Sequence, residues 1–143
     1  MTPLESVAVG VLSGAFGTMI TLVVQHRLRR AQLREAERTR LREMYGTWVG
    51  AFTTAGRAIR LLQNIEKNVT AKQEFAREYY QASETVTRIT WEICLLDHDQ
   101  SRRDRVLAAH IAFTQDEDDV RAASLAAQLL EELSESGDLR EAK

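Results

Sequence analysis

The chain has 143 residues, of which 44% are hydrophobic and 28% are charged, and it contains one proline and one cysteine. This length suffices for about one small domain, and the composition is typical of a helical protein, which excludes a disordered chain. The lone cysteine, Cys94, excludes a disulfide within the chain and fits a reducing cytosol.

The first clear pattern is the apolar run from Val7 to Val24, which contains no charged residue. A helix rises about 1.5 Å per residue and the hydrocarbon core of a bilayer is about 30 Å thick, so roughly twenty mainly apolar residues can cross it. Residues 4–24 reach that length. We therefore predict a transmembrane anchor over residues 1–25, and the alternative is a helix whose glycine face packs in a globular core. A cleaved signal peptide is disfavoured, because Glu5 and no basic side chain precedes the run.

Small residues recur along this predicted span at helical spacing. They are Gly10, Gly14, Gly17 and Thr21. In lipid, helices associate through close backbone approach at small residues, so this stripe predicts self-association or pairing with another membrane protein. Glycine is also common in membrane helices that make no such contact, which is the alternative. The hydroxyls of Thr18 and Thr21 are compatible with a span, because each can bond to a carbonyl one turn earlier.

A basic segment follows the run at once. Residues 26–42 hold seven arginines against two glutamates, which is a net charge of +5 with histidine neutral. An excess of arginine beside a span keeps that side in the cytoplasm. We expect an inner or plasma membrane protein with a single span, its amino terminus outside and residues 25–143 in the cytoplasm. The arginines nearest the bilayer, which orient the span and contact lipid headgroups, are Arg27, Arg29, Arg30 and Arg34. The alternative to lipid contact is that the arginines only orient the span and that the helix beyond them is solvated.

The remaining chain reads as amphipathic helices. Apolar residues recur in steps of three and four from Leu41 to Ile65 and again from Phe75 to Leu96. The short connection between the two segments makes them antiparallel neighbours, and Thr70 has the spacing of a helix cap for the second. We expect the seam between them to contain Trp48, Phe52, Phe75, Tyr79, Val86, Ile89 and Ile93, and we expect Trp91 in the core beside it.

Two shorter helices should follow. The third is predicted over roughly residues 103–113, and the fourth is predicted to start with a cap at Thr114 and to stop near Ser136 and Gly137. The inward side chains of the third helix are expected to be Val106, Leu107, His110 and Ile111. Those of the fourth are expected to be Val120, Ala123, Ala127, Leu130 and Leu133.

Together these patterns predict an all-α fold in which a single amino-terminal transmembrane helix continues into a cytosolic antiparallel helical hairpin or small three- to four-helix bundle. The expected organisation is a transmembrane anchor at 1–25, an Arg-rich juxtamembrane helix at 26–42, the bundle at 43–136 and a flexible tail at 137–143.

No pattern of catalytic or cofactor-binding residues emerges. The sequence has no phosphate-binding glycine loop, no nucleophile elbow and no Glu-x-x-His pair. Cys94 and His98 lie one helical turn apart, but two ligands without a second pair favour a buried thiol and a capping histidine over a metal site. We expect no enzyme, metal, cofactor or small-molecule substrate. We also expect no nucleic-acid partner, because no aromatic residue interleaves the arginines.

The interpretation that follows is a membrane-anchored, non-enzymatic interaction or scaffold protein. Its expected partners are membrane lipid, further copies of itself in a homo-oligomer and a protein that the sequence does not identify. The alternative is an oligomeric membrane effector or pore-type subunit that is gated by its cytosolic bundle.

Overall fold

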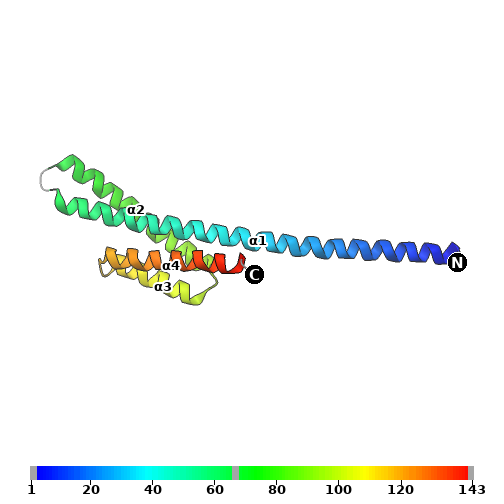
Figure 1. Cartoon of the computed structure of the whole chain (residues 1–143). Coiled ribbons are helices and arrows are strands. Elements are labelled where there is room, and N and C mark those ends of the chain that lie inside the picture. Colours follow the sequence, from blue (N-terminus) through cyan, green and yellow to red (C-terminus); the bar gives the residue numbers. More distant parts are fainter. Residues whose placement is uncertain (1–2, 66–67, 142–143) are drawn as a thin grey trace. The chain divides into compact units, whose positions relative to one another are not determined.

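The computed structural model describes the backbone of residues 3–65 and 68–141 and the side chains of residues 14–65 and 68–136. Over this part of the chain the secondary structure consists of four helices without a strand: α1 (Pro3–Asn64), α2 (Val69–Leu96), α3 (Gln100–Thr114) and α4 (Asp119–Glu141), as Figure 1 shows. The predicted all-α fold class is therefore confirmed. The chain divides into two compact units, unit 1 at residues 1–39 and unit 2 at residues 40–143.

Unit 1 is formed by the amino-terminal part of α1. Pro3 is the first residue of that helix, where a missing N–H is tolerated because the first amides of a helix have no partner within it. No later proline removes a hydrogen bond from α1, so the helix continues uninterrupted to Asn64. All the described side chains of unit 1, from residue 14 to residue 39, are exposed.

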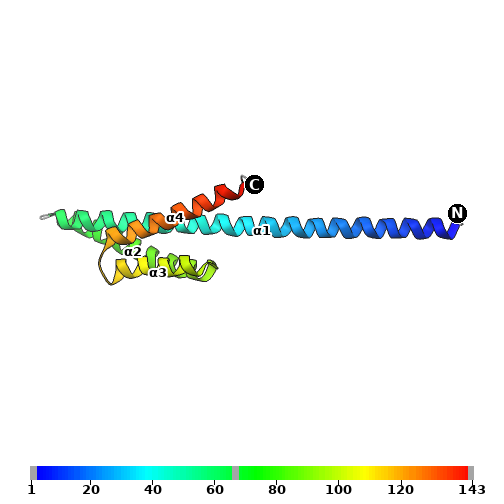
Figure 2. The same ribbon diagram turned by 60° about the horizontal axis from the view of Figure 1, so that its bottom comes forward.

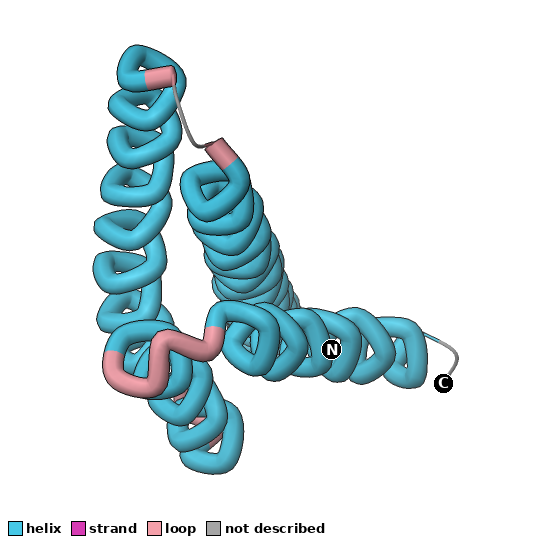
Figure 3. Tube along the Cα trace, turned by 90° about the vertical axis from the view of Figure 1, so that its left-hand side faces the viewer, coloured by secondary structure: helices cyan, strands magenta, loops and turns pink. Residues whose placement is uncertain are grey.

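Unit 2 pairs the carboxyl-terminal part of α1 with α2 in antiparallel orientation. Three contacts between the helices define the register, because their residue numbers rise along α1 and fall along α2: Tyr45 with Asp97, Trp48 with Thr90, and Arg57 with Glu78. Figure 2 shows α3 and α4 completing the unit, and Figure 3 shows that the described loops are only short connections between helices. The predicted helical bundle is thereby confirmed.

Aromatic side chains form the centre of the unit 2 core. Trp48 of α1 lies edge-to-face with Tyr45 at a centroid distance of 5.9 Å and with Phe52 at 4.9 Å. Phe52 in turn meets Phe113 of α3 edge-to-face at 5.2 Å. Each such pair contributes about 0.5–1.5 kcal/mol beyond the apolar area that it buries. These contacts bind α3 to α1 across the core.

The helices of unit 2 face inward largely through small residues. The buried alanines are Ala51, Ala55, Ala58, Ala82, Ala109, Ala112, Ala122 and Ala126. A helix face made of alanine lets a neighbouring helix approach closely, so the larger buried residues fill the space that remains. On α4 these are Leu129 and Leu133.

The predicted inward face of α4 is correct at Leu133, and the predicted Ala123 and Leu130 are half-buried against the core, but the fully buried positions are shifted by one residue. Val120 is 65% exposed, and the buried positions are Ala122, Ala126 and Leu129 rather than their following neighbours. Adjacent apolar pairs at these places satisfy the helical period in two registers, and the sequence alone does not choose between them. On α3 the same applies to Ile111, which is exposed, whereas Ala112 and Phe113 are buried.

Trp91 is also misplaced by the sequence prediction. It is 57% exposed, and its neighbour Thr90 is fully buried instead. The Thr90 hydroxyl accepts a hydrogen bond of 2.9 Å from the indole Nε1 of Trp48 and donates one of 2.7 Å to the Val86 carbonyl. A polar side chain therefore occupies the core position because it provides a buried indole N–H with the acceptor that it needs.

The helix caps differ from those predicted at Thr70 and Thr114. The side chains of Asn68, Asp99 and Asp118 accept hydrogen bonds from the backbone amides of Ala71 (3.2 Å), Arg102 (3.0 Å) and Arg121 (2.9 Å). Asn and Asp are stronger caps than Thr, so α2 starts one residue before Thr70 and α3 starts at Gln100 instead of residue 103. Thr114 ends α3 with its hydroxyl bonded to the His110 carbonyl. The predicted stop of α4 near Gly137 is wrong, because the helix continues to Glu141.

Candidate functional site

The described part of the predicted span is a helix whose apolar side chains are exposed. Its large side chains are between 48% and 66% exposed, and they are Phe16, Met19, Ile20, Leu22, Val23 and Val24. At 3.6 residues per turn these six positions occupy one broad side of α1. Gly14, Gly17, Thr18 and Thr21 occupy the opposite side. The helix is therefore uncharged and mainly apolar all round.

The small-residue side of this helix is smooth and open. A Cβ atom added at Gly14 or Gly17 would meet nothing within 4 Å. The Thr18 hydroxyl donates to the Gly14 carbonyl at 2.8 Å and the Thr21 hydroxyl to the Gly17 carbonyl at 2.9 Å, as predicted. Gly10, the first member of the predicted stripe, lies outside the described side chains. The three described positions thus leave room for another backbone to approach.

Among the residues that the structure describes, no helix is both long enough and apolar enough to cross a bilayer. The predicted span starts at residue 4, and the side chains of residues 1–13 are not among those described.

The four arginines predicted to meet lipid headgroups follow the apolar side chains on the same helix. Arg27, Arg29, Arg30 and Arg34 are all exposed. None of the ion pairs between described residues involves the segment from residue 26 to residue 42. These exposed guanidinium groups can donate hydrogen bonds to water or to an external anion.

The seven predicted seam residues of unit 2 fall into two groups. Trp48, Phe52, Val86, Ile89 and Ile93 are buried. Phe75 and Tyr79 lie closer to the amino end of α2 and are half-buried. Tyr79 packs against Phe113 with the ring centroids 6.2 Å apart, where the seam opens toward the surface.

An ionic cluster that the sequence did not predict joins α1 to the α2–α3 connection. Asp97 is only 1% exposed. Its carboxylate accepts hydrogen bonds from the Tyr45 hydroxyl (2.9 Å), from Arg102 Nε (2.8 Å) and Nη2 (2.7 Å), and from the Asp99 amide (3.0 Å). This bidentate contact is the geometry in which arginine holds a carboxylate best. The sequence signal was an Asp directly after an apolar helix with an Arg five residues later.

The environment of the cluster keeps its charges in place. Burial alone raises the pKa of Asp97, but the hydrogen bonds from Arg102, Asp99 and Tyr45 outweigh burial and leave that pKa below its usual value. Burial and the adjacent carboxylate raise the pKa of Tyr45 far above its ordinary range. Asp97 is therefore an anion and Tyr45 a neutral donor at physiological pH. The cluster thus has a structural role and does not act as an acid–base pair.

The two residues weighed as a metal-ligating pair from the sequence differ in exposure. Cys94 is half-buried and unpaired, and His98 is exposed. Burial raises the pKa of the Cys94 thiol, which makes it a poorer nucleophile and ligand. Among the described residues no group of three or more His, Cys, Asp or Glu side chains could hold a metal ion.

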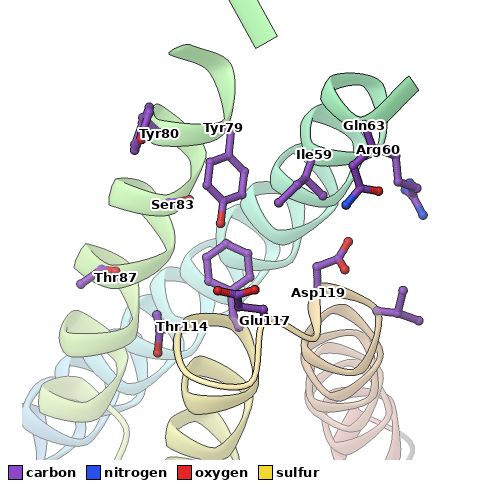
Figure 4. A pocket seen from close by; sticks show the side chains of 12 residues that line it. Ile59, Arg60, Gln63, Tyr79, Tyr80, Ser83, Thr87, Thr114, Glu117 and Asp119 are labelled. Carbon is purple, nitrogen blue, oxygen red and sulfur yellow. The ribbon is translucent and has the colours of Figure 1, made fainter. Parts of the chain in front are cut away.

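A cavity of about 500 Å³ lies between the last turns of α1, the first half of α2 and the α3–α4 connection (Figure 4). Its wall includes Tyr79, Tyr80 and Phe113, and Glu117 and Asp119 line it from the connection and the start of α4. Glu117 has a backbone φ of 51°, a left-handed conformation that non-glycine residues rarely adopt. No sequence pattern indicated this cavity, because its wall comes from all four helices.

Comparisons with known proteins give no family for this chain, since no protein-family model, curated protein or solved structure matches it.

Proposed function

We propose that this chain is a membrane-anchored, non-enzymatic interaction protein, with residues 4–24 as the anchor and unit 2 as a cytoplasmic body that meets a protein partner. One observation carries the proposal. The large side chains from Phe16 to Val24 are about half exposed or more, and the small residues opposite them are open as well. A helix that is apolar on every side is stable only inside a protein core or a membrane.

The energy of covering this helix is large. Burying one side chain such as Phe, Leu, Ile, Val or Met contributes about 1.5–3 kcal/mol, so the six exposed residues together represent on the order of 10 kcal/mol. Lipid would cover these side chains without requiring a specific partner. The exposed arginines that follow favour anionic headgroups on one side of the bilayer, and they support a cytoplasmic position for unit 2.

Self-association through the small-residue side is part of the proposal. Gly14, Gly17 and Thr21 lie on one side of α1 with no atom within 4 Å of either glycine's Cβ position, and Gly10 extends the stripe in sequence. A second copy of the helix could approach closely there.

The same geometry favours an anchor over a pore. A pore lining needs polar groups that face the water column. The hydroxyls of Thr18 and Thr21 instead donate to carbonyls of their own helix. Those donors are already used within α1, and the span offers few others.

The anchor is tested by membrane fractionation of the full chain with one arginine added to the helix. Phe16→Arg places a charge near the middle of the predicted span, which costs roughly 2.5–3.5 kcal/mol on insertion scales. We expect the wild-type chain to remain in the membrane pellet after alkaline carbonate extraction and the F16R chain to move largely to the supernatant.

Leu33→Arg is the matched control, because Leu33 is a 57% exposed apolar residue on the same helix beyond the first arginines. The L33R chain should stay in the pellet. Extraction of the wild-type chain by carbonate alone, or equal release of both variants, contradicts the proposal.

A further inference from the structure

Three aromatic side chains line the cavity in unit 2. The ring centroids of Tyr79 and Phe113 lie 6.2 Å apart, and that of Tyr80 lies 6.0 Å from Tyr79. All three rings line a space of about 500 Å³. That volume is within the range of roughly 300–1,000 Å³ that small-molecule sites occupy. The negative faces of aromatic rings attract a cation placed within about 6 Å of them.

The charged groups of the cavity leave it with negative charge. Glu117 and Asp119 contribute two carboxylates and Arg60 one guanidinium. None of the three takes part in an ion pair between described residues. Figure 4 shows the Asp119 carboxylate directed toward the last turns of α1. Two carboxylates beside aromatic rings favour a positively charged guest over an anion.

Space for the Asp119 carboxylate is provided by a glycine. Its Oδ2 lies 2.8 Å from the position that a Cβ atom would occupy at Gly56. A larger residue at position 56 would push the carboxylate away. Gly56 is itself buried, so the Asp119 carboxylate approaches it inside unit 2, at the amino end of α4, and not in open solvent.

The cavity also offers a polar group without a partner. The buried Ser83 hydroxyl makes no hydrogen bond with any described residue, although a helical serine can bond to a carbonyl one turn earlier. A buried hydroxyl left in this state costs stability, and a ligand hydroxyl would satisfy it.

We propose that this cavity binds a small organic ammonium ion of the hydroxyalkyl quaternary class. The rings of Tyr79 and Phe113 contact the ammonium group, the carboxylates of Glu117 and Asp119 balance its charge, and Ser83 pairs with its hydroxyl. The proposal goes beyond the function proposed above and does not depend on how unit 1 is anchored.

The test is calorimetric titration of the full chain in detergent micelles with choline chloride at constant ionic strength. The matched probe is 3,3-dimethyl-1-butanol, which has the shape of choline without its charge. We expect saturable binding of choline and about tenfold weaker binding of the neutral alcohol, because cation–π and charge contributions are absent from the alcohol. Equal affinity for both probes, or no saturable binding of choline, overturns the proposal.

Four variants locate the site. Tyr79→Leu should weaken choline binding about fivefold by removing a ring face, and Asp119→Asn about threefold by removing a charge. Arg60→Gln should strengthen it about threefold, since an exposed cation that lines the cavity is lost. Asp116→Asn, a change in the same connection at a residue outside the cavity wall, should have no effect. Choline binding that is unchanged in Y79L and R60Q places it elsewhere and contradicts the assignment.

Discussion

Asp97 is the residue on which the α2–α3 connection depends. It is an anion held inside unit 2 by four hydrogen bonds, two of them from Arg102, whose side chain is 25% exposed. A buried charge is expensive unless every acceptor is satisfied, and here the satisfying groups come from α1, from α3 and from the connection itself. The carboxylate therefore fixes the relative positions of three helices rather than adding a large net stability.

Replacing Asp97 with Asn tests this account. Asp97→Asn keeps the size of the side chain but removes the charge that Arg102 holds, and we expect the free energy of unfolding at pH 7 to fall by about 2–3 kcal/mol. The measurement is chemical denaturation followed by circular dichroism. Asp116→Asn, at an exposed position, is the control and should change stability by less than about 0.5 kcal/mol.

The difference in stability between the wild type and D97N should depend on pH. The folded pKa of Asp97 lies below the unfolded value, so its contribution is present above the unfolded pKa of about 3.9 and is lost as the pH falls through the folded pKa. The stability difference between wild type and D97N should accordingly shrink in acid. A difference that stays constant down to pH 2 would show that the charge of Asp97 is not its source.

At the scale of the helices, the glycines of α1 are of two kinds. Some lie on open faces, and one lies where a neighbouring helix makes contact. Gly46 and Gly50 of α1 are exposed, with nothing within 4 Å of an added Cβ, although their spacing resembles a helix-contact pair. Gly56 is the position that a neighbour approaches, through the Asp119 carboxylate of α4. Spacing alone did not distinguish these glycines, because the approach depends on where α4 begins.

Alanine substitutions distinguish the two kinds of glycine. Gly50→Ala should raise the free energy of unfolding by about 0.5–1 kcal/mol, since alanine favours a helix and the site is open. Gly56→Ala should gain less, because the added Cβ displaces Asp119. Measured against Asp119→Ala alone, the double variant G56A/D119A should show the full gain in the free energy of unfolding. Equal stabilisation by G50A and G56A in thermal unfolding would contradict the close approach.

The helices were predictable from the sequence to the extent that their apolar positions were unambiguous. The strict period from Phe75 to Leu96 located α2. Adjacent apolar pairs on α4 left two possible inward faces that differ by one residue. Asn68 and Asp118 cap their helices in place of nearby threonines. The Asp97 cluster and the cavity were not predictable. Each brings together residues far apart in sequence, and only the antiparallel packing of α1 on α2 shows that Tyr45 meets Asp97.

For the molecule as a whole, the described core belongs to unit 2 alone. Its buried cluster and the residues packed on it start at Leu41, and none comes from unit 1. Such a division separates the part that is held together by its own packing from the part whose apolar surface is open.

A fragment of residues 40–143 should therefore fold by itself. We expect it to show a helical circular dichroism spectrum and a cooperative thermal transition within a few degrees of that of unit 2 in the full chain. A shorter fragment, residues 52–143, is the control, because it lacks Tyr45 and Trp48, two of the largest fully buried side chains. It should not unfold cooperatively. Loss of cooperativity in the longer fragment would mean that unit 1 supports the core.

The contrasting surroundings of the two tryptophans give the chain a pair of built-in optical reporters. The Trp48 indole is completely enclosed and hydrogen-bonded to Thr90, whereas the Trp91 indole is mostly in contact with solvent. Their emission should consequently differ in wavelength and in access to an aqueous quencher. Fluorescence from Trp48 therefore reports whether the core of unit 2 is folded. Fluorescence from Trp91 reports the binding of a partner to the exposed side of α2.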